Sequence, residues 1–178
     1  MSGLFTRNRV LGLALAAFIA AMDQLSKWVV TGPLRLREVG HIDLLPFFDL
    51  TYTENRGISL GMLQASSPEM RWLLVLVTLV IATVVLVWLL RETKLGDILG
   101  LALILGGAIG NIYDRAMLGY VVDFADFHIG DFRPFLIFNV ADAAITIGVV
   151  IILARSLLVS EKDDATGPAP AADAVSEK

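Results

Sequence analysis

Four apolar stretches alternate with two polar segments along the chain. The apolar stretches cover residues 10–30, 71–90, 95–113 and 135–158. Each is close to the ~20 residues that a helix needs to cross the hydrocarbon core of a bilayer. Charged residues, glycines and prolines gather in residues 31–70 and 114–134, which are therefore expected outside the membrane. The pattern predicts one multi-pass membrane domain over residues 1–160 and a polar, disordered tail over residues 161–178.

The first apolar stretch allows two interpretations. Arg7 and Arg9 precede it, and a small-residue site near Ala20 resembles the cleavage site of a signal peptide. However, the apolar run continues after Asp23 and Lys27, so we predict an uncleaved helix. These two residues are four apart and share a helix face, where they can pair. They could form an interfacial ion pair with an outward-reaching lysine, or belong to a site.

The first polar segment contains an alternating pattern. Apolar and polar side chains alternate over residues 48–53, which predicts a half-exposed strand of a small sheet. The strand leads into Asn55-Arg56-Gly57, a sequence that by itself is most typical of a structural turn. The apolar residues 58–63 that follow are expected to lie on the membrane surface.

Small and polar residues form one stripe on the third apolar stretch. Gly107, Gly110, Asn111 and Asp114 are spaced i, i+3, i+4 and i+7. Glycines allow helices to approach closely in lipid. Polar groups on such a stripe need partners inside the bundle, because lipid offers none.

Two carboxylates have apolar neighbours at the edges of membrane-spanning sequence. Asp123 follows Val121-Val122, and Asp142 follows Val140-Ala141. A charge costs several kcal/mol in such a setting, so a functional site is expected, although a structural salt bridge is the alternative. If the fourth helix opens at Pro134, Asp142 lies ~12 Å along it, shallow in the bilayer. Two such carboxylates fit an aspartic pair that shares one proton.

Composition narrows the chemistry. The 178 residues are 56% hydrophobic with a mean hydropathy of +0.73, too apolar for an ordinary soluble domain. The chain has no cysteine and only two histidines, which disfavours thiol or histidine-based catalysis. A metal site built from Asp126, His128 and Asp131 has one imidazole and no established ligand spacing, so we expect no metal. The net charge of −4 includes no basic face for nucleic acid.

Five motifs in order resemble the bacterial prolipoprotein signal peptidases, also called type II signal peptidases. They are Asp23-Gln24-Leu25-Ser26-Lys27, Asn55-Arg56-Gly57, the stretch from Gly106 to Arg115, Val122-Asp123-Phe124, and the stretch from Phe138 to Asp142. The resemblance extends over about residues 10 to 158. One departure is Ile58-Ser59-Leu60, where many members of the family have two small residues and an aromatic residue.

The resemblance implies an all-α membrane protein with four transmembrane helices, a small periplasmic β-sheet, or cradle, and a periplasmic loop. It also implies a location in the bacterial inner membrane with both termini in the cytoplasm. The activity it implies is that of an aspartic endopeptidase, which cleaves prolipoproteins before a diacylglyceryl-modified cysteine. Expected partners are these substrates, membrane lipids and the family's peptide antibiotics. A monomer without cofactors is expected.

The resemblance also assigns roles to individual residues. Asp123 and Asp142 correspond to the catalytic pair. The positions that support the site or contact the substrate correspond to Asp23, Lys27, Asn55, Gly107, Asn111, Arg115 and Asn139.

Two other functions suit intramembrane carboxylates. Membrane carboxylates, an Asp–Lys pair and glycine-lined helices also suit a small proton-coupled transporter. Four spans without an internal repeat argue against this function. In a non-catalytic assembly protein, polar residues would only hold helices together. The three differ in whether polar residues converge at one shallow site, follow a path across the membrane, or are scattered in pairs.

Overall fold

The computed structural model describes residues 6–57 and 68–165, with side chains up to residue 158. Among these residues, four helices are long and apolar enough to cross a membrane. They are α1 (Arg7–Thr31), α3 (Pro68–Arg91), α4 (Leu95–Met117) and α5 (Val140–Ala165). The predicted four-helix membrane fold is thus confirmed. Ile58-Ser59-Leu60, the surface segment 58–63 and the end of the tail lie outside the described residues.

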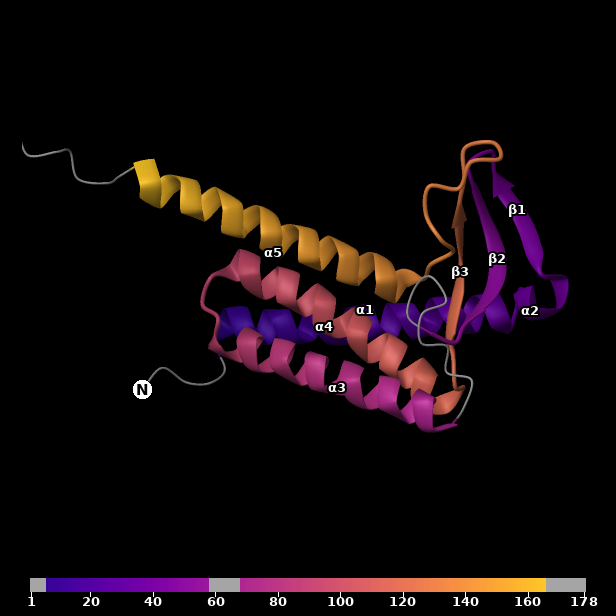
Figure 1. Ribbon diagram of the computed structural model, residues 1–178, viewed down its shortest axis with the longest axis horizontal. Helices are drawn as coiled ribbons and strands as arrows, with labels where there is room; N and C mark the ends of the chain where they lie inside the picture. The colour runs from indigo at the N-terminus through magenta and orange to yellow at the C-terminus, as the bar shows by residue number, and fades with distance from the viewer. Residues whose placement is uncertain (1–5, 58–67, 166–178) are drawn as a thin grey trace, which may run out of the picture.

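Helix α4 occupies the middle of the bundle (Figure 1). It packs against α1, α3 and α5, and its buried Ile98, Leu101 and Leu105 belong to an aliphatic core that also includes Ala16 and Leu89. Helix α1 begins and α5 ends at the same end of the molecule, opposite the sheet (Figure 1).

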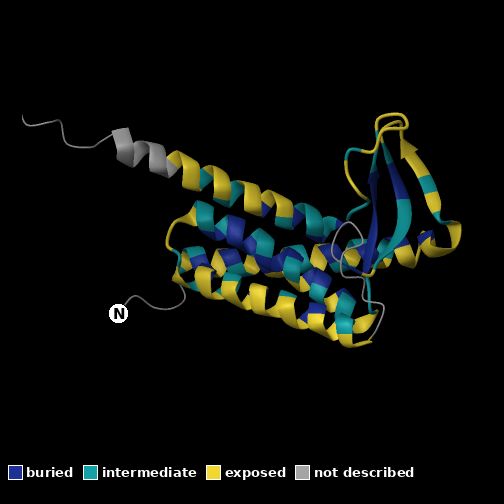
Figure 2. Ribbon diagram, in the orientation of Figure 1, coloured by how far each residue is buried: buried dark blue, intermediate teal, exposed yellow. Residues whose placement is uncertain are grey.

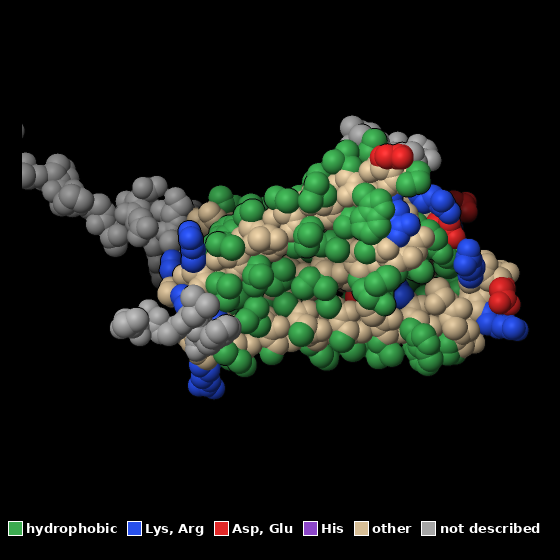
Figure 3. Space-filling view, turned by 90° about the horizontal axis from the view of Figure 1, so that it is seen from below, with side chains coloured by type: hydrophobic (Ala, Val, Ile, Leu, Met, Phe, Trp, Pro, Cys, Tyr) green, Lys and Arg blue, Asp and Glu red, His purple; other side chains and the backbone are tan. Residues whose placement is uncertain are grey.

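The outer faces of the helices are apolar. Most of their outward residues are exposed (Figure 2), and hydrophobic side chains cover the length of the bundle with Lys and Arg at one end and mixed charges at the other (Figure 3). Such an exposed apolar band would be unfavourable in water and suits a lipid environment.

A three-stranded antiparallel sheet lies at one end of the bundle. Its order is β1 (His41–Leu45), β2 (Phe48–Asn55) and β3 (Val121–Phe127), and a short helix, α2 (Leu36–Val39), precedes it. The strand expected at residues 48–53 is confirmed as part of β2. In contrast, β3 falls in a segment that was expected to be a loop. The alternation of apolar and polar residues that would indicate a strand is absent there, because Val121 to Asp126 are all buried.

The fourth membrane helix begins later than predicted. It starts at Val140, and Phe138 instead exchanges backbone hydrogen bonds with Ala125 of β3 at 3.1 and 2.8 Å. The placement of Asp142 ~12 Å inside a helix that opens at Pro134 was therefore wrong, since Asp142 lies in the first turn of α5. At the other end, α5 continues to Ala165, beyond the predicted start of the tail.

Candidate active site

Asp123 is held by two amide side chains. Asn139 Nδ2 donates to its Oδ1 at 2.6 Å, and Asn55 Nδ2 donates to its Oδ2 at 3.0 Å. Asp123 belongs to β3, whereas Asn55 ends β2 and Asn139 directly precedes α5. The sheet and the start of the fourth membrane helix therefore meet at this carboxyl group, which is 2% exposed.

Asp142 and Asn139 form a reciprocal helix cap. The backbone N–H of Asp142 donates to Asn139 Oδ1 at 2.9 Å, and the backbone N–H of Asn139 donates to Asp142 Oδ2 at 3.4 Å. This is the capping-box arrangement, with Asn139 in place of the usual Ser or Thr and Asp142 in place of the usual Glu or Gln. The positive end of the α5 dipole also favours a negative charge at Asp142.

Asn111 of α4 completes the amide network. Its Nδ2 donates to Asp142 Oδ1 at 2.8 Å, while its Oδ1 accepts from Asn139 Nδ2 at 3.3 Å and from Lys27 Nζ at 3.4 Å. Asp123 and Asp142 are thus linked through Asn139 and through the pair Asn139–Asn111. The polar stripe predicted on α4 finds its partners here.

The surroundings of Asp123 favour its protonated form. Burial, followed by the negative charge of Asp142, raises its pKa from 3.8 to about 7. The hydrogen bonds from Asn55 and Asn139 and the charge of Lys27 act in the opposite direction but are smaller. Asp123 can therefore hold a proton near neutral pH.

A buried ion network lies beside the two carboxylates. Lys27 Nζ is 2.8 Å from Asp23 Oδ2 and 2.8 Å from Asp114 Oδ2, and its side chain is 5% exposed. The predicted pairing of Asp23 with Lys27 is confirmed. The alternative in which Lys27 reaches outward from the bundle is wrong, because its side chain is buried. Asp23 Oδ1 also accepts the N–H of Ala141 at 3.0 Å, so α1 holds the first turn of α5.

Comparison with known proteins shows the family of this chain. The family model described as "Signal peptidase (SPase) II" matches residues 15–158. The chain belongs to the signal peptidase II family. The "Lipoprotein signal peptidase" of Sphingopyxis alaskensis is 55% identical over 91% of this chain and 94% of its own length. That of Rhizorhabdus wittichii is 56% identical over 86% and 90%.

A solved structure resembles this peptidase over most of its length. It is titled "Bacterial membrane enzyme structure by the in meso method at 2.3 A resolution" and superposes with a TM-score of 0.74 at 26% identity. The superposition covers 89% of this chain and 93% of the other. The chain is a peptidase of the membrane, and its fold is that of a bacterial membrane enzyme.

The remaining predicted site residues of the peptidase lie close to this network. Gly107 of α4 faces the carbonyl oxygen of Ala141, where an added Cβ would clash, so a glycine is needed for the contact between α4 and α5. Arg115 donates to the carbonyl of Gly57 at 3.3 Å, and its charge interacts with Asp142 and Asp123. All nine predicted residues thus lie in or beside one cluster.

Two residues of this cluster were not among the predicted site positions. Gln24 Nε2 donates to Asp114 Oδ1 at 2.9 Å and to the carbonyl of Gly110 at 3.3 Å. Asp114 also accepts the backbone N–H of Val122 at 3.1 Å, which ties α4 to the start of β3. The signal for Gln24 was its place in the Asp23 motif, whereas Asp114 belongs to the polar stripe of the third apolar stretch, whose polar groups need partners inside the bundle.

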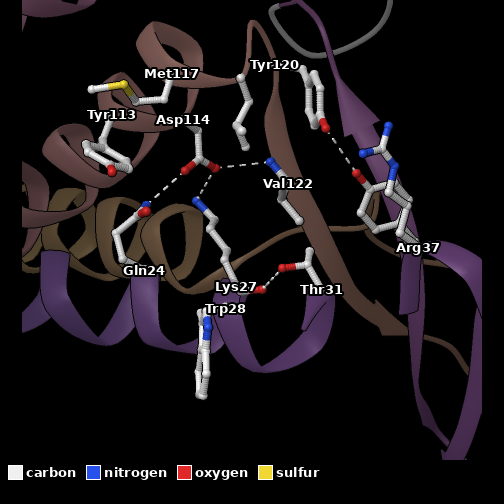
Figure 4. Close-up of a pocket in the computed structure, with 12 residues that line it drawn as sticks. Gln24, Lys27, Trp28, Thr31, Arg37, Tyr113, Asp114, Met117, Tyr120 and Val122 are labelled. Carbon is white, nitrogen blue, oxygen red and sulfur yellow. Dashed lines mark hydrogen bonds and ion pairs between the residues drawn. The ribbon is translucent and has the colours of Figure 1, made fainter. Parts of the chain in front are cut away.

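A cavity of about 370 Å³ opens next to the ion network (Figure 4). Trp28 of α1, Tyr113 of α4 and Tyr120 line it, while Lys27 and Asp114 form its inner wall. The polar contacts from Asp114 through Lys27 and Asn111 lead from this cavity to Asp142.

Asp97 and Asp126 lie outside this cluster. Asp97 pairs with Arg155 at 2.7 Å in the opposite half of the bundle. Asp126, which was expected in a loop, is buried in β3, where Thr51 and Arg133 bind it at 3.1 and 3.2 Å. The trio Asp126, His128 and Asp131 is not among the groups whose ligand atoms come together in the described part of the chain.

Proposed function

We propose that this peptidase is an aspartic endopeptidase that removes signal peptides from diacylglyceryl-modified prolipoproteins, cutting before the lipidated cysteine. The observation that carries the proposal is the amide network that joins Asp123 to Asp142 at the sheet end of the membrane helices. A substrate anchored by lipid has its scissile bond near the membrane surface, where such a site is accessible to it.

The two carboxyl groups take complementary roles in this mechanism. Asp142, at the positive end of α5, is ionised and removes a proton from water. The water oxygen attacks the scissile carbonyl carbon while protonated Asp123, whose pKa is raised to about 7, donates its proton to the carbonyl oxygen. The tetrahedral intermediate then collapses: the C–N bond breaks, the proton on Asp142 passes to the leaving amine, and Asp123 takes back its proton from the hydroxyl formed at the carbonyl, which restores the pair. Because Asp123 and Asp142 are proposed to share one proton, the two carboxyl groups titrate as a pair.

The other residues of the cluster position this pair. Asn111, Asn139 and Asn55 supply amide donors that orient the carboxylates. Arg115, beside Gly57, is placed to contact the substrate backbone or the carboxylates. Asp23, Lys27 and Gly107 hold α1 and α4 against the first turn of α5.

The distribution of polar groups disfavours a transporter. The amide and ion network lies at the sheet end, and the next buried part of α4 is aliphatic, with Leu105, Ala102, Leu101 and Ile98. A proton path across the membrane needs polar groups or water along its length. The described helices therefore favour a single shallow site.

The proposed location is the bacterial inner membrane, with the sheet in the periplasm and both termini in the cytoplasm. Arg7, Arg9, Arg91 and Lys94 lie at the ends of α1, α3 and α4 remote from the sheet, as positive charges on the cytoplasmic side do. Membrane lipids surround the apolar faces, and the family's peptide antibiotics would occupy the same site. The working unit is proposed to be a monomer.

Cleavage of a purified prolipoprotein by the purified chain tests this function. The substrate is prepared with and without the diacylglyceryl group on its cysteine, and the products are identified by mass. We expect cleavage immediately before the lipidated cysteine and little cleavage of the unmodified protein. Absence of cleavage, or equal cleavage of both substrates, would contradict the proposal.

A further inference from the structure

Two histidines and two aspartates meet at the end of the sheet remote from Asp123. His41 and Asp43 belong to β1, Asp49 lies near the start of β2, and His128 follows β3. Asp49 is six residues from Asn55 along the strand, which at ~3.3 Å per residue separates this cluster from the carboxylate pair by about 20 Å. The cluster is therefore not part of the peptidase site.

The ligating atoms of the cluster face one another. His41 Nε2 is 2.9 Å from Asp43 Oδ1 and 3.5 Å from Asp49 Oδ2. His128 Nε2 is 2.8 Å from the same Asp49 Oδ2. The buried carboxylate of Asp49, 8% exposed, thus lies between two imidazole nitrogens, although the alternation along β2 predicts an exposed side chain.

Hydrogen bonds fix the tautomer of His128. Its Nδ1 lies 3.3 Å from the carbonyl oxygen of Gly130, which can only accept, so Nδ1 carries the hydrogen. In the neutral ring Nε2 then has a free lone pair. This nitrogen is buried and has no hydrogen-bond partner among the described residues, although Asp49 Oδ2 lies 2.8 Å from it.

A hydrogen bond also orients the ring of His41. Thr51 Oγ1 donates to Asp126 Oδ2 at 3.1 Å, so this hydroxyl accepts from His41 Nδ1 at 2.8 Å. His41 Nε2 is hydrogen-bonded to Asp43 Oδ1 at 2.9 Å, so a metal ion bound by both groups would replace the hydrogen between them. A hydrogen bond at the other ring nitrogen is also how metal-binding histidines are oriented in proteins.

We propose that His41, Asp43 and Asp49 form a binding site for a divalent transition metal ion of the zinc class, with His128 beside Asp49 as a supporting residue. The ligand atoms of His41, Asp43 and Asp49 all lie within 4.8 Å of one another. Ligands ~2.0–2.2 Å from one tetrahedral ion lie about 3.3 Å apart. The separations of His41 Nε2 from the two carboxylates, 2.9 and 3.5 Å, lie on either side of this value.

The ligand types define the class of ion. Imidazole nitrogens together with carboxylates suit zinc, nickel or copper, whereas calcium and magnesium prefer oxygen ligands alone. The side chain of Asp43 is 91% exposed, so an ion can reach the site from solvent at this position. The ligands come from β1 and β2, so the ion would fasten the exposed edge strand β1 to the rest of the sheet.

Cobalt binding tests the site directly, because Co²⁺ replaces Zn²⁺ and absorbs visible light when bound by such ligands. The intact protein, purified without a polyhistidine tag, is titrated with Co²⁺ in detergent, and bound Co²⁺ is then displaced by Zn²⁺. We expect one equivalent per chain. His41→Gln, His128→Gln and Asp43→Asn should each weaken binding at least about tenfold, whereas Asp131→Asn, in the same exposed loop region, should bind as the unmodified protein does.

Thermal unfolding with and without Zn²⁺ gives a second measurement. Zn²⁺ should raise the Tm of the unmodified protein and of Asp131→Asn, but not that of the double variant His41→Gln/His128→Gln. Retained peptidase activity of the double variant, whose changes lie far from the carboxylate pair, shows that it is folded. Should it not fold, Asp43→Asn, at an exposed position, provides the same comparison. Absence of saturable binding, or unchanged binding in the ligand variants, would overturn the proposal and leave only ion pairs.

Discussion

Asn139 donates a 2.6 Å hydrogen bond to Asp123, and the same side chain caps the helix that carries Asp142. One residue therefore sets the position of both carboxyl groups. The arrangement links a strand of the extramembrane sheet to the first turn of a membrane helix. Small movements of the sheet would thus reach both acidic groups together.

Asn139→Ala should lower kcat/KM by about 10–100-fold without preventing membrane insertion, because leaving buried polar groups without their hydrogen-bond partner costs roughly 1–3 kcal/mol. The measurement is the cleavage rate of a diacylglyceryl-modified prolipoprotein. Asn8→Ala is the matched control, since the Asn8 side chain donates a hydrogen bond to the carbonyl of Thr93 near the other end of the bundle. Cleavage by Asn139→Ala at the unmodified rate would refute the role of Asn139.

The stability of the protein should fall as the pH rises between about 4 and 7. Burial and the charge of Asp142 raise the pKa of Asp123 from 3.8 to about 7, so in this range the native state holds a proton that the unfolded state has lost. Above the folded pKa the full cost of the buried charge is present. Asp123→Asn removes this titration and should flatten the dependence of Tm on pH. Parallel curves for the two proteins would contradict the raised pKa.

Lys27→Met should destabilise the protein by about 3–5 kcal/mol, because it leaves the buried carboxylates of Asp23 and Asp114 without their cation. Thermal unfolding in detergent measures the effect. Lys94→Met, at the exposed turn between α3 and α4, is the control and should change stability by less than ~0.5 kcal/mol. Equal losses in the two variants would show that the buried network contributes no more than a surface charge.

Thr93→Cys should be protected from a membrane-impermeant maleimide in intact cells and become labelled once the inner membrane is opened. Thr93 lies in the turn between α3 and α4, at the end opposite the sheet. The chain has no other cysteine, so the label reports this position alone. Asp131→Cys, on the sheet side, should be labelled in intact cells. The reverse pattern would invert the proposed orientation.

Local sequence patterns predicted much of the fold. Hydropathy identified the four membrane helices, and the i, i+4 spacing of Asp23 and Lys27 predicted their ion pair. The start of α5 was also readable, because Asn139 and Asp142 have the spacing of a capping box. Pro134 was taken as the helix start instead, although Phe138, which follows it, pairs with Ala125 of β3.

Features that depend on distant parts of the chain were not predictable in this way. Strand β3 pairs with β2 through residues such as Asp123 and Thr53, and its burial on both faces removes the alternation that reveals a strand. Gln24 and Asp114 are 90 positions apart, and nothing local shows that they bond. The position of Asp49 between two imidazoles likewise depends on the packing of three strands.

The central claim is that Asp123 and Asp142 perform the cleavage together, and the cleavage rate of Asp123→Asn and Asp142→Asn tests it most directly. Each change should reduce turnover of a diacylglyceryl-modified prolipoprotein at least ~1,000-fold, because members of one catalytic unit cannot replace each other. Substrate binding should largely remain, since Asn preserves shape and removes repulsion between the carboxylates. Asp97→Asn, which changes the ion pair with Arg155, should retain most activity. Substantial cleavage by either Asp123→Asn or Asp142→Asn would contradict the account.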